Sequence, residues 1–169
     1  MADETGEDTR SPQREERGHR TVPHTADVRI EAWGGSREQC LAEAVLGMVE
    51  CFADLTGLSE AEAHSVRHLR VTGNSDADLL ATLLDEIVFR VEVHGEVPVA
   101  VETETVETAP TDRASAAAAS GGNEVEVRLA VRDLASVPIT GAPPKAVSWN
   151  ELQLEPGPSG WSCAVTVDV

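Results

Sequence analysis

The hydrophobic residues of this chain repeat with one period in the first half and another in the second half. This difference limits the folds that the chain can form. A period near 3.6 is typical of amphipathic helices, and a period of 2 is typical of half-buried strands. The first half contains two helical stripes, made of Cys40, Leu41, Ala44, Val45, Met48, Val49 and Phe52, and of Leu79, Leu80, Leu83, Leu84, Ile87, Val88 and Val91. In the second half, valines alternate with other residues over 97–101 and 125–131. The pattern therefore predicts two helices and antiparallel strands with one buried and one solvated face.

Capping residues indicate where the two helices begin. Ser36 precedes the first stripe and has Gln39 at the capping-box position, so we expect a helix from Ser36 to about Ala53. Ser75 precedes the second stripe, with Asp78 three residues further on. A serine side chain at this position accepts a hydrogen bond from a free backbone N–H of the first turn, which favours helix initiation.

The remaining segments predict a single domain. We expect strands over 28–32, 66–72, 97–101, 125–131, 145–154 and 161–168. Residues 1–18 mix charges of both signs with little to bury, which indicates a disordered tail before a domain of residues 19–169. Residues 108–122 are rich in Ala, Ser, Thr and Gly and predict a flexible excursion at a hairpin tip. The expected fold class is α+β, a single two-layer domain in which two amphipathic helices cover an antiparallel-rich sheet.

The charge balance argues against direct nucleic-acid binding. The chain has 30 acidic and 13 basic residues, a formal net charge of −17, and Lys145 as its only lysine. Proteins that bind a phosphate backbone draw their affinity from Lys and Arg side chains that neutralise phosphates. Any nucleic-acid role is therefore expected to run through a protein partner, and the acidic excess is equally explained by solubility.

Cysteine usage and the lack of long apolar runs predict a cytoplasmic protein. Cys40, Cys51 and Cys163 show no CxxC spacing, and we expect them to be small buried thiols in a reducing compartment. The N-terminal residues are charged, unlike those of a signal peptide. No apolar run reaches the length that spans a membrane, so no membrane association is expected.

The common catalytic motifs are absent from the sequence. There is no P-loop, no GxGxxG, no GxSxG and no HExxH. His24 is better explained as a residue that shapes its own turn than as a metal ligand. No activated nucleophile is indicated, so the sequence does not point to an enzyme.

Acidic residues mark both ends of the predicted domain. Asp27 precedes the first predicted strand, and Asp168 is the penultimate residue of the last one, beside the terminal carboxylate of Val169. If these two strands are neighbours, three carboxylates gather and repel one another unless protons or a cation compensate. Such hard oxygen ligands suit Ca²⁺ or Mg²⁺. The alternative is that Asp168 is simply a solvated strand end.

Several motifs together resemble the archease family. They are His24-Thr25-Ala26-Asp27-Val28 with a strand ending in Ala32-Trp33-Gly34, the helix from Asp78 to Val88, the segment Lys145-Ala146-Val147-Ser148-Trp149, and the aliphatic-Asp-aliphatic end of the chain. The resemblance covers about residues 19–169. Two positions depart from the family pattern: Arg29 stands where a glycine is usual, and Asn150 where a histidine is often found.

The resemblance implies a function and a site. Archeases are protein cofactors that activate RtcB-type RNA ligases in tRNA splicing and RNA repair, by promoting guanylylation of the ligase and its turnover. Their divalent-metal site maps onto Asp27, Asp168 and Val169, with calcium the expected ion and magnesium or manganese as alternatives. Lys145 is a candidate contact to the ligase, or else the partner of a neighbouring acid. The alternative functions are a general chaperone or modulator of nucleic-acid-processing proteins, and a metal-dependent hydrolase.

Overall fold

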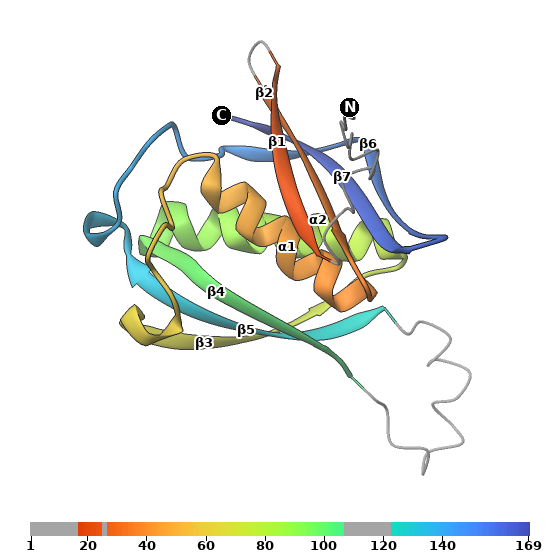
Figure 1. Cartoon of the computed structure of the whole chain (residues 1–169), viewed down its shortest axis with the longest axis horizontal. Helices are drawn as coiled ribbons and strands as arrows, with labels where there is room; N and C mark the ends of the chain where they lie inside the picture. The colour runs from red at the N-terminus through yellow and green to blue at the C-terminus, as the bar shows by residue number, and fades with distance from the viewer. Residues whose placement is uncertain (1–16, 25–26, 107–122) are drawn as a thin grey trace, which may run out of the picture.

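Two antiparallel sheets enclose two helices (Figure 1). The computed structural model describes residues 17–24, 27–106 and 123–169. The expected tail lies outside this range except for its last two residues, and the expected excursion at 108–122 lies outside it entirely.

The first sheet combines the beginning and the end of the described chain. It contains β1 (Gly18–His24), β2 (Asp27–Gly34), β7 (Gly160–Asp168) and β6 (Ala146–Gly157), in the order β1-β2-β7-β6. All of its neighbouring strands are antiparallel. The sheet therefore places the first strands beside the last ones (Figure 1).

The second sheet is built from the middle of the chain. It contains β3 (Ser65–Thr72), β5 (Glu124–Asp133) and β4 (Glu96–Thr105), in the order β3-β5-β4. Short 3₁₀ turns at Glu60–Glu62 and Leu134–Ser136 flank β3 and β5.

Both helices begin at the predicted caps. The Ser36 hydroxyl accepts a hydrogen bond from the Gln39 N–H at the start of α1 (Arg37–Glu50), and the Ser75 hydroxyl accepts one from the Asp78 N–H at the start of α2 (Asp76–Phe89), both at 3.1 Å. A π-helical turn, Arg90–His94, extends α2. Neither of the described helices is long and apolar enough to cross a membrane.

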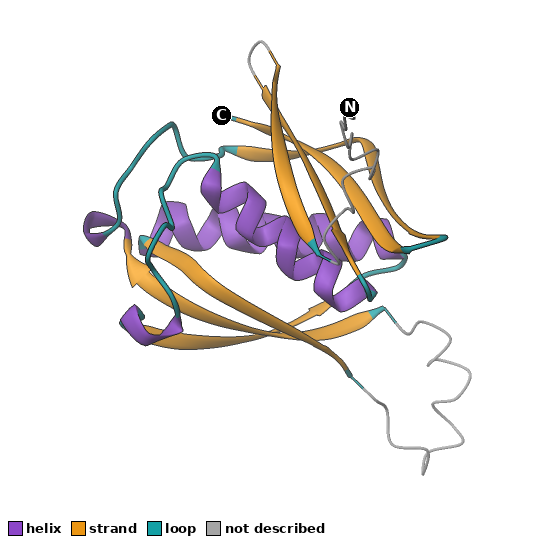
Figure 2. Ribbon diagram, in the orientation of Figure 1, coloured by secondary structure: helices purple, strands orange, loops and turns teal. Residues whose placement is uncertain are grey.

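The α+β class, the antiparallel pairing and the two helices are confirmed, whereas the expected single covered sheet is corrected to two sheets. The helices lie between the sheets (Figure 2): α1 packs on β2 and β4, and α2 packs on β6 and β3. The burial of α1 gives the physical reason. Beyond the predicted stripe, Ala42, Glu43 and Gly47 are also buried, so the helix is covered around most of its circumference.

The strand β1 was not predicted from the sequence. Its sequence, GHRTVPH, has a single aliphatic residue and a proline, so it shows no alternating pattern. Such a segment is compatible with an edge strand, where one side of the backbone has no neighbour and a proline is tolerated. β1 indeed forms an edge of the first sheet.

The three cysteines are free thiols, as expected. Cys40 and Cys163 are buried. Burial also raises the pKa of the Cys51 thiol to about 11, with a further contribution from the nearby Glu50 carboxylate. The Cys51 thiol is therefore protonated and unreactive at neutral pH.

An ionic clamp fixes β1 to α1. His19 of β1 binds two carboxylates of the helix, with Nδ1 2.8 Å from Glu43 Oε1 and Nε2 2.5 Å from Glu50 Oε2. Arg17 donates a further hydrogen bond to Glu43 at 2.6 Å. Gly47 makes room for the imidazole, because a Cβ there would lie 2.9 Å from Ile30 Cγ2 and 3.2 Å from His19 Cβ.

The clamp requires a charged imidazole, because both ring nitrogens face carboxylates and both must donate. The hydrogen bond with Glu43 is the largest cause that raises the pKa of His19 to about 8, against the effect of partial burial. Burial would raise the pKa of Glu43, but the hydrogen bonds from His19 and Arg17 lower it below its usual value. Glu43 is the one buried charged residue among the described residues, with 8% of its surface exposed.

We expect the stability of the protein to fall between pH 6.5 and 9, in a way that depends on His19. A pKa raised on folding stabilises the fold fully below the unfolded value of about 6.5, and this contribution is lost as the pH rises through about 8. The contribution is about 1–2 kcal/mol. Urea denaturation of wild type and His19→Gln at pH 6 and pH 9 measures it.

The matched control for this experiment is His68→Gln, which changes an exposed histidine of β3. The stability difference between wild type and His19→Gln should shrink at pH 9, whereas His68→Gln should follow wild type at both pH values. An equal difference at both pH values for His19→Gln would contradict the clamp.

Candidate functional site

Asp27 and Asp168 lie directly opposite each other in the first sheet. Asp27 is the first residue of β2 and Asp168 the last residue of β7, and the antiparallel register pairs them. This confirms the expectation that the first predicted strand and the last one are neighbours. Directly opposed residues of an antiparallel pair have Cβ atoms about 4.5–5.5 Å apart, so the two side chains start from adjacent positions.

The strand alternation turns both aspartates away from the helices. The next pair along the ladder is Val28 with Val167, and Val167 is fully buried. Because side chains alternate between faces, Asp27 and Asp168 occupy the outer face. Two like charges directly opposite each other destabilise a sheet unless a proton or a cation compensates them. The register therefore brings together two of the three residues that were expected to hold a cation.

The neighbouring residues on the other side of Asp168 come from the start of β6. The Lys145 N–H donates a 2.7 Å hydrogen bond to the Asp168 carbonyl oxygen, and Ala146 is the register partner of Asp168. Val169 follows β7, and its side chain packs against the core. His24 pairs with Asp27 through the backbone register of β1, whereas Thr25 and Ala26 lie outside the described residues.

Lys145 differs from the arginines of the described chain. Its side chain is exposed and forms no ion pair or hydrogen bond with any of the described residues. Each arginine in the same ranges forms an ion pair with a carboxylate or a hydrogen bond with a backbone carbonyl: Arg17, Arg20, Arg29, Arg37, Arg67, Arg70, Arg90, Arg128 and Arg132. The alternative expectation, that Lys145 pairs with a neighbouring acid, therefore finds no support in the structure.

A wide bulge in β6 forms a pocket beside Asp27. Ser148 pairs with Thr166 and Gln153 with Ala164, so residues 149–152 stand opposite Val165 alone. The pocket has a volume of about 370 Å³, and its lining comes from β2, β7 and the bulge: Asp27, Arg29, Ser148, Asn150, Glu151 and Thr166. Arg29 and Asn150, the two departures from the family pattern, thus line one pocket.

The sequence predicts an uninterrupted strand over 145–154, and the bulge was not expected. Its residues carry two unusual features. Glu151 has a φ of 60°, a left-handed conformation that is uncommon for residues other than glycine, asparagine and aspartate. Trp149 is 55% exposed, although it belongs to a strand. Residues 149–152 contain no glycine, so nothing in the local sequence indicates the bulge.

The side chains near Asp27 limit how a metal ion could be held. In the described ranges, no three side chains of His, Cys, Asp or Glu gather closely enough to hold a metal ion. A cation at the aspartate pair would therefore need further oxygen ligands from other sources, such as backbone oxygens, a carboxylate at Val169 or water. Carboxylate oxygens with water completing the shell fit Ca²⁺ well.

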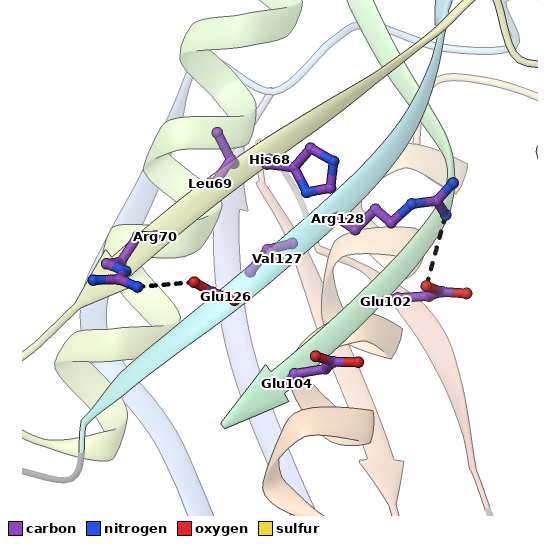
Figure 3. Close-up of a pocket in the computed structure, with 8 residues that line it drawn as sticks. All are labelled: His68, Leu69, Arg70, Glu102, Glu104, Glu126, Val127 and Arg128. Carbon is purple, nitrogen blue, oxygen red and sulfur yellow. Dashed lines mark hydrogen bonds and ion pairs between the residues drawn. The ribbon is translucent and has the colours of Figure 1, made fainter. Parts of the chain in front are cut away.

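A second pocket, of about 330 Å³, lies on the outer face of the three-stranded sheet (Figure 3). Its arginines are already bound to acids. Arg70 lies 2.9 Å from Glu126 and 3.1 Å from Glu124, and Arg128 contacts Glu60 and, at 3.6 Å, Glu102. Both arginines of this pocket are held by acids, so this pocket is a weaker candidate for a site than the pocket beside Asp27.

Known proteins similar to this chain share one family. The Archease protein family (MTH1598/TM1083) matches residues 19–169. The "Probable protein archease" of Mycobacterium tuberculosis is 43% identical over 152 residues, which cover 90% of this chain and 75% of that protein. The "Protein archease" of Methanosarcina barkeri is 26% identical over 148 residues, 88% of this chain and 93% of that protein.

Two solved structures share the fold. The solution structure of Methanobacterium thermoautotrophicum protein 1598 aligns with a TM-score of 0.67 and 20% identity, over 90% of this chain and 99% of that one. The crystal structure described as "an archease, possible chaperone" from Thermotoga maritima aligns with a TM-score of 0.55 and 18% identity, over 88% and 94%. The family match over residues 19–169 and the 43% identity to a mycobacterial archease show that the chain belongs to the archease family.

Proposed function

We propose that this protein is a cytoplasmic cofactor that activates an RtcB-type RNA ligase, by promoting guanylylation of the ligase and its turnover in tRNA splicing or RNA repair. Asp27, Asp168 and the terminal carboxylate of Val169 hold a divalent cation in this proposal, with calcium the best candidate. Membership of the archease family and the resemblance described above motivate the proposal.

The single observation that carries the proposal is the register of β2 and β7, which opposes Asp27 and Asp168 on the outer face. Two carboxylates directly opposite each other cost stability unless a proton or a positive charge compensates them. A hard divalent cation turns this repulsion into attraction, and its affinity for oxygen ligands fits the residues available.

The residues of this chain have separate tasks in the proposed mechanism. Asp27 and Asp168 hold the cation, which supplies a positive charge for anionic oxygens of the partner complex. Lys145 presents a second positive charge beside Asp168, and its lack of a partner among the described residues supports a role in contacting the ligase. The nucleotide chemistry itself takes place on the ligase.

The charges of the described surface support a protein partner rather than direct contact with RNA. The arginines of the described chain are bonded to protein groups, as on the outer face in Figure 3. With a net charge of −17, little positive charge remains to attract a phosphate backbone.

A general chaperone is the second candidate function. The Thermotoga maritima relative is described as a possible chaperone, and Phe89 and Val93 expose apolar side chains near the end of α2. A chaperone would suppress the aggregation of unrelated proteins, and neutralising Asp27 or Asp168 would leave that activity unchanged.

Calcium should stabilise the wild-type protein and not the variants Asp27→Asn and Asp168→Asn. A ligand that binds only the folded state raises its stability. In EDTA, each variant should be at least as stable as wild type, because the repulsion between the two carboxylates is removed. Thermal unfolding with EDTA and with saturating calcium measures both effects. A calcium-induced stabilisation that persists in both variants would place the cation elsewhere.

Ligase stimulation should require the same two aspartates. Multiple-turnover RNA ligation by an RtcB-type ligase is measured with wild type, Asp27→Ala, Asp168→Ala and the control Glu104→Gln, which neutralises an exposed acid of β4. Most of the stimulation should be lost in both aspartate variants and kept in the control. Full stimulation by the aspartate variants would refute the mechanism, and no stimulation by wild type would favour the chaperone.

Extension of the chain beyond Val169 should weaken calcium binding, because an uncharged amide replaces the terminal carboxylate. Calorimetric titration of calcium into the protein with and without a short C-terminal extension measures this difference. A protein with the same extension at its N-terminus is the control. Equal calcium affinity of all three proteins would exclude Val169 as a ligand.

A further inference from the structure

The edge strand β1 is held in the first sheet with very little apolar packing. The hydrophobic core of the described chain contains no residue of β1. Within residues 18–22, Gly18 and His19 are half-buried and the other three are exposed. The attachment therefore depends on the backbone ladder with β2, the close approach of Gly18 to the Trp33 ring, and the ionic clamp of His19.

The clamp changes when the imidazole of His19 loses its proton. A charged ring donates hydrogen bonds from both nitrogens, whereas a neutral ring donates from only one. One of the two carboxylates, Glu43 or Glu50, then faces a ring nitrogen that carries a lone pair, and the positive charge that attracted both of them is gone. Glu43 is 8% exposed, and a buried carboxylate that loses a compensating charge destabilises the arrangement that buries it.

We propose that His19 is a proton-dependent switch, which holds β1 in the first sheet when its ring is protonated and releases β1 in a local opening when its ring is neutral. Release admits water to Glu43, which removes the cost of its burial. The strand β2 keeps its place, because Ile30 and Ala32 are fully buried and its ladder with β7 is unaffected. Segments with few buried apolar contacts are typically the ones that open locally.

The charged groups of β2 are bonded away from the switch. The register partner of His19 is Ala32, whose side chain faces the buried side of the sheet. Glu31 lies next to it and therefore on the opposite face, where it contacts Arg20 at 2.5 Å and Arg29 at 3.8 Å. These three charges cross no part of the clamp, so they hold β1 equally at every pH between 6 and 9.

The remaining groups near the clamp do not titrate in this range. Arg17 contacts Glu43 and also lines a pocket with Glu102 and Glu104 of β4, a pocket that does not include His19. The thiol of Cys51, which follows α1 and lies near the clamp carboxylate Glu50, has a pKa of about 11 and stays protonated. Among the described groups around the clamp, His19 is therefore the one whose charge changes.

The pKa of His19 sets the pH range of the switch. The hydrogen bond with Glu43 is the largest cause that raises this pKa to about 8 in the folded protein, and release of β1 returns it to its ordinary value of 6.5. The hold on β1 is complete below pH 6.5 and is lost as the pH rises through 8. The equilibrium constant for release should therefore rise about twentyfold between pH 6 and pH 9.

Release of β1 changes the position of Asp27 in the sheet. His24, the last residue of β1, is the register partner of Asp27, so β2 becomes an edge strand at this residue when β1 leaves. The pairing of Asp27 with Asp168 belongs to the other side of β2 and is not part of the switch. The inference does not rest on the proposed function, because His19 has no task in binding the cation or the ligase.

Amide hydrogen exchange of the full chain, measured by NMR at pH 6 and pH 9, tests the switch. Protection factors, the ratios of intrinsic to observed exchange rates, remove the general acceleration of exchange by base. The β1 amides that bond to β2 should lose protection about twentyfold from pH 6 to pH 9. The midpoint of this loss should coincide with the titration of the His19 ring, followed through its Cε1–H signal in the wild-type protein.

Low concentrations of urea distinguish local release from global unfolding. Local opening exposes little surface, so the protection of the β1 amides should not change between 0 and 1 M urea. The buried amides of Val165 in β7 and Leu83 in α2 exchange through larger openings, and their protection should fall at least about fivefold.

Variants identify the group that controls the release. His19→Gln should lower the protection of the β1 amides at pH 6 and abolish the difference between pH 6 and pH 9. His68→Gln, which changes an exposed histidine of β3, should follow wild type. Glu31→Gln, which removes the ion pair with Arg20 on the other face of β1, should lower the protection by the same factor at both pH values.

Three results would each overturn the inference. The first is equal protection of the wild-type β1 amides at pH 6 and pH 9. The second is a pH dependence that persists unchanged in His19→Gln or has a midpoint apart from the titration of the His19 ring. The third is a urea dependence of the β1 amides equal to that of Val165, which would show that β1 opens only together with the whole domain.

Discussion

The antiparallel pairing of β2 with β7 is the interaction on which the rest of this structure depends. It joins segments from the two ends of the described chain, and it fixes the register of every residue discussed as a candidate ligand. One face of this ladder is buried through Ile30, Val165 and Val167. A slip by one residue would turn these side chains outward and Asp27 inward, so core packing holds the two aspartates opposite each other.

The position of α1 between two sheets explains why the helix contains a buried glutamate. A helix at a protein surface can turn its charged residues to water, but α1 contacts β2 on one side and β4 on the other. Glu43 is compensated by His19 and Arg17, which both come from the N-terminal segment. The same contacts hold the edge strand β1 in place, so one buried charge gives a strand with little apolar character a defined position.

Much of the fold could be predicted because the sequence patterns are local. Ser36 and Ser75 cap their helices as expected, and Val125, Val127 and Leu129 of β5 alternate with more exposed residues, whereas a register shift between Pro98 and Ala100 interrupts the alternation in β4. The division of the strands into two sheets could not be predicted, because it depends on which face of α1 meets which strands. The strand β1 was missed because its packing relies on an ionic clamp rather than on an apolar stripe.

The candidate site, too, could be predicted only where its residues belong to local sequence patterns. Asp27 and Asp168 were recognisable from their motifs, and their pairing followed from the assumption that the first and last predicted strands are neighbours. The pocket beside them could not be foreseen, because the bulge at Trp149 and Glu151 is set by the register of β6 against β7. Because residues 149–152 contain neither glycine nor proline, their sequence predicts an ordinary strand.

The pairing of β2 with β7 also has a consequence for biosynthesis. A ribosome produces β2 early and β7 late, and almost the whole described chain lies between them. Contacts between such distant segments form late in folding because closing the intervening loop costs entropy. A nascent chain that has not yet released β7 therefore lacks one of the two aspartates and leaves an open edge on β2. The acidic pair becomes available only in protein whose synthesis has passed this last strand.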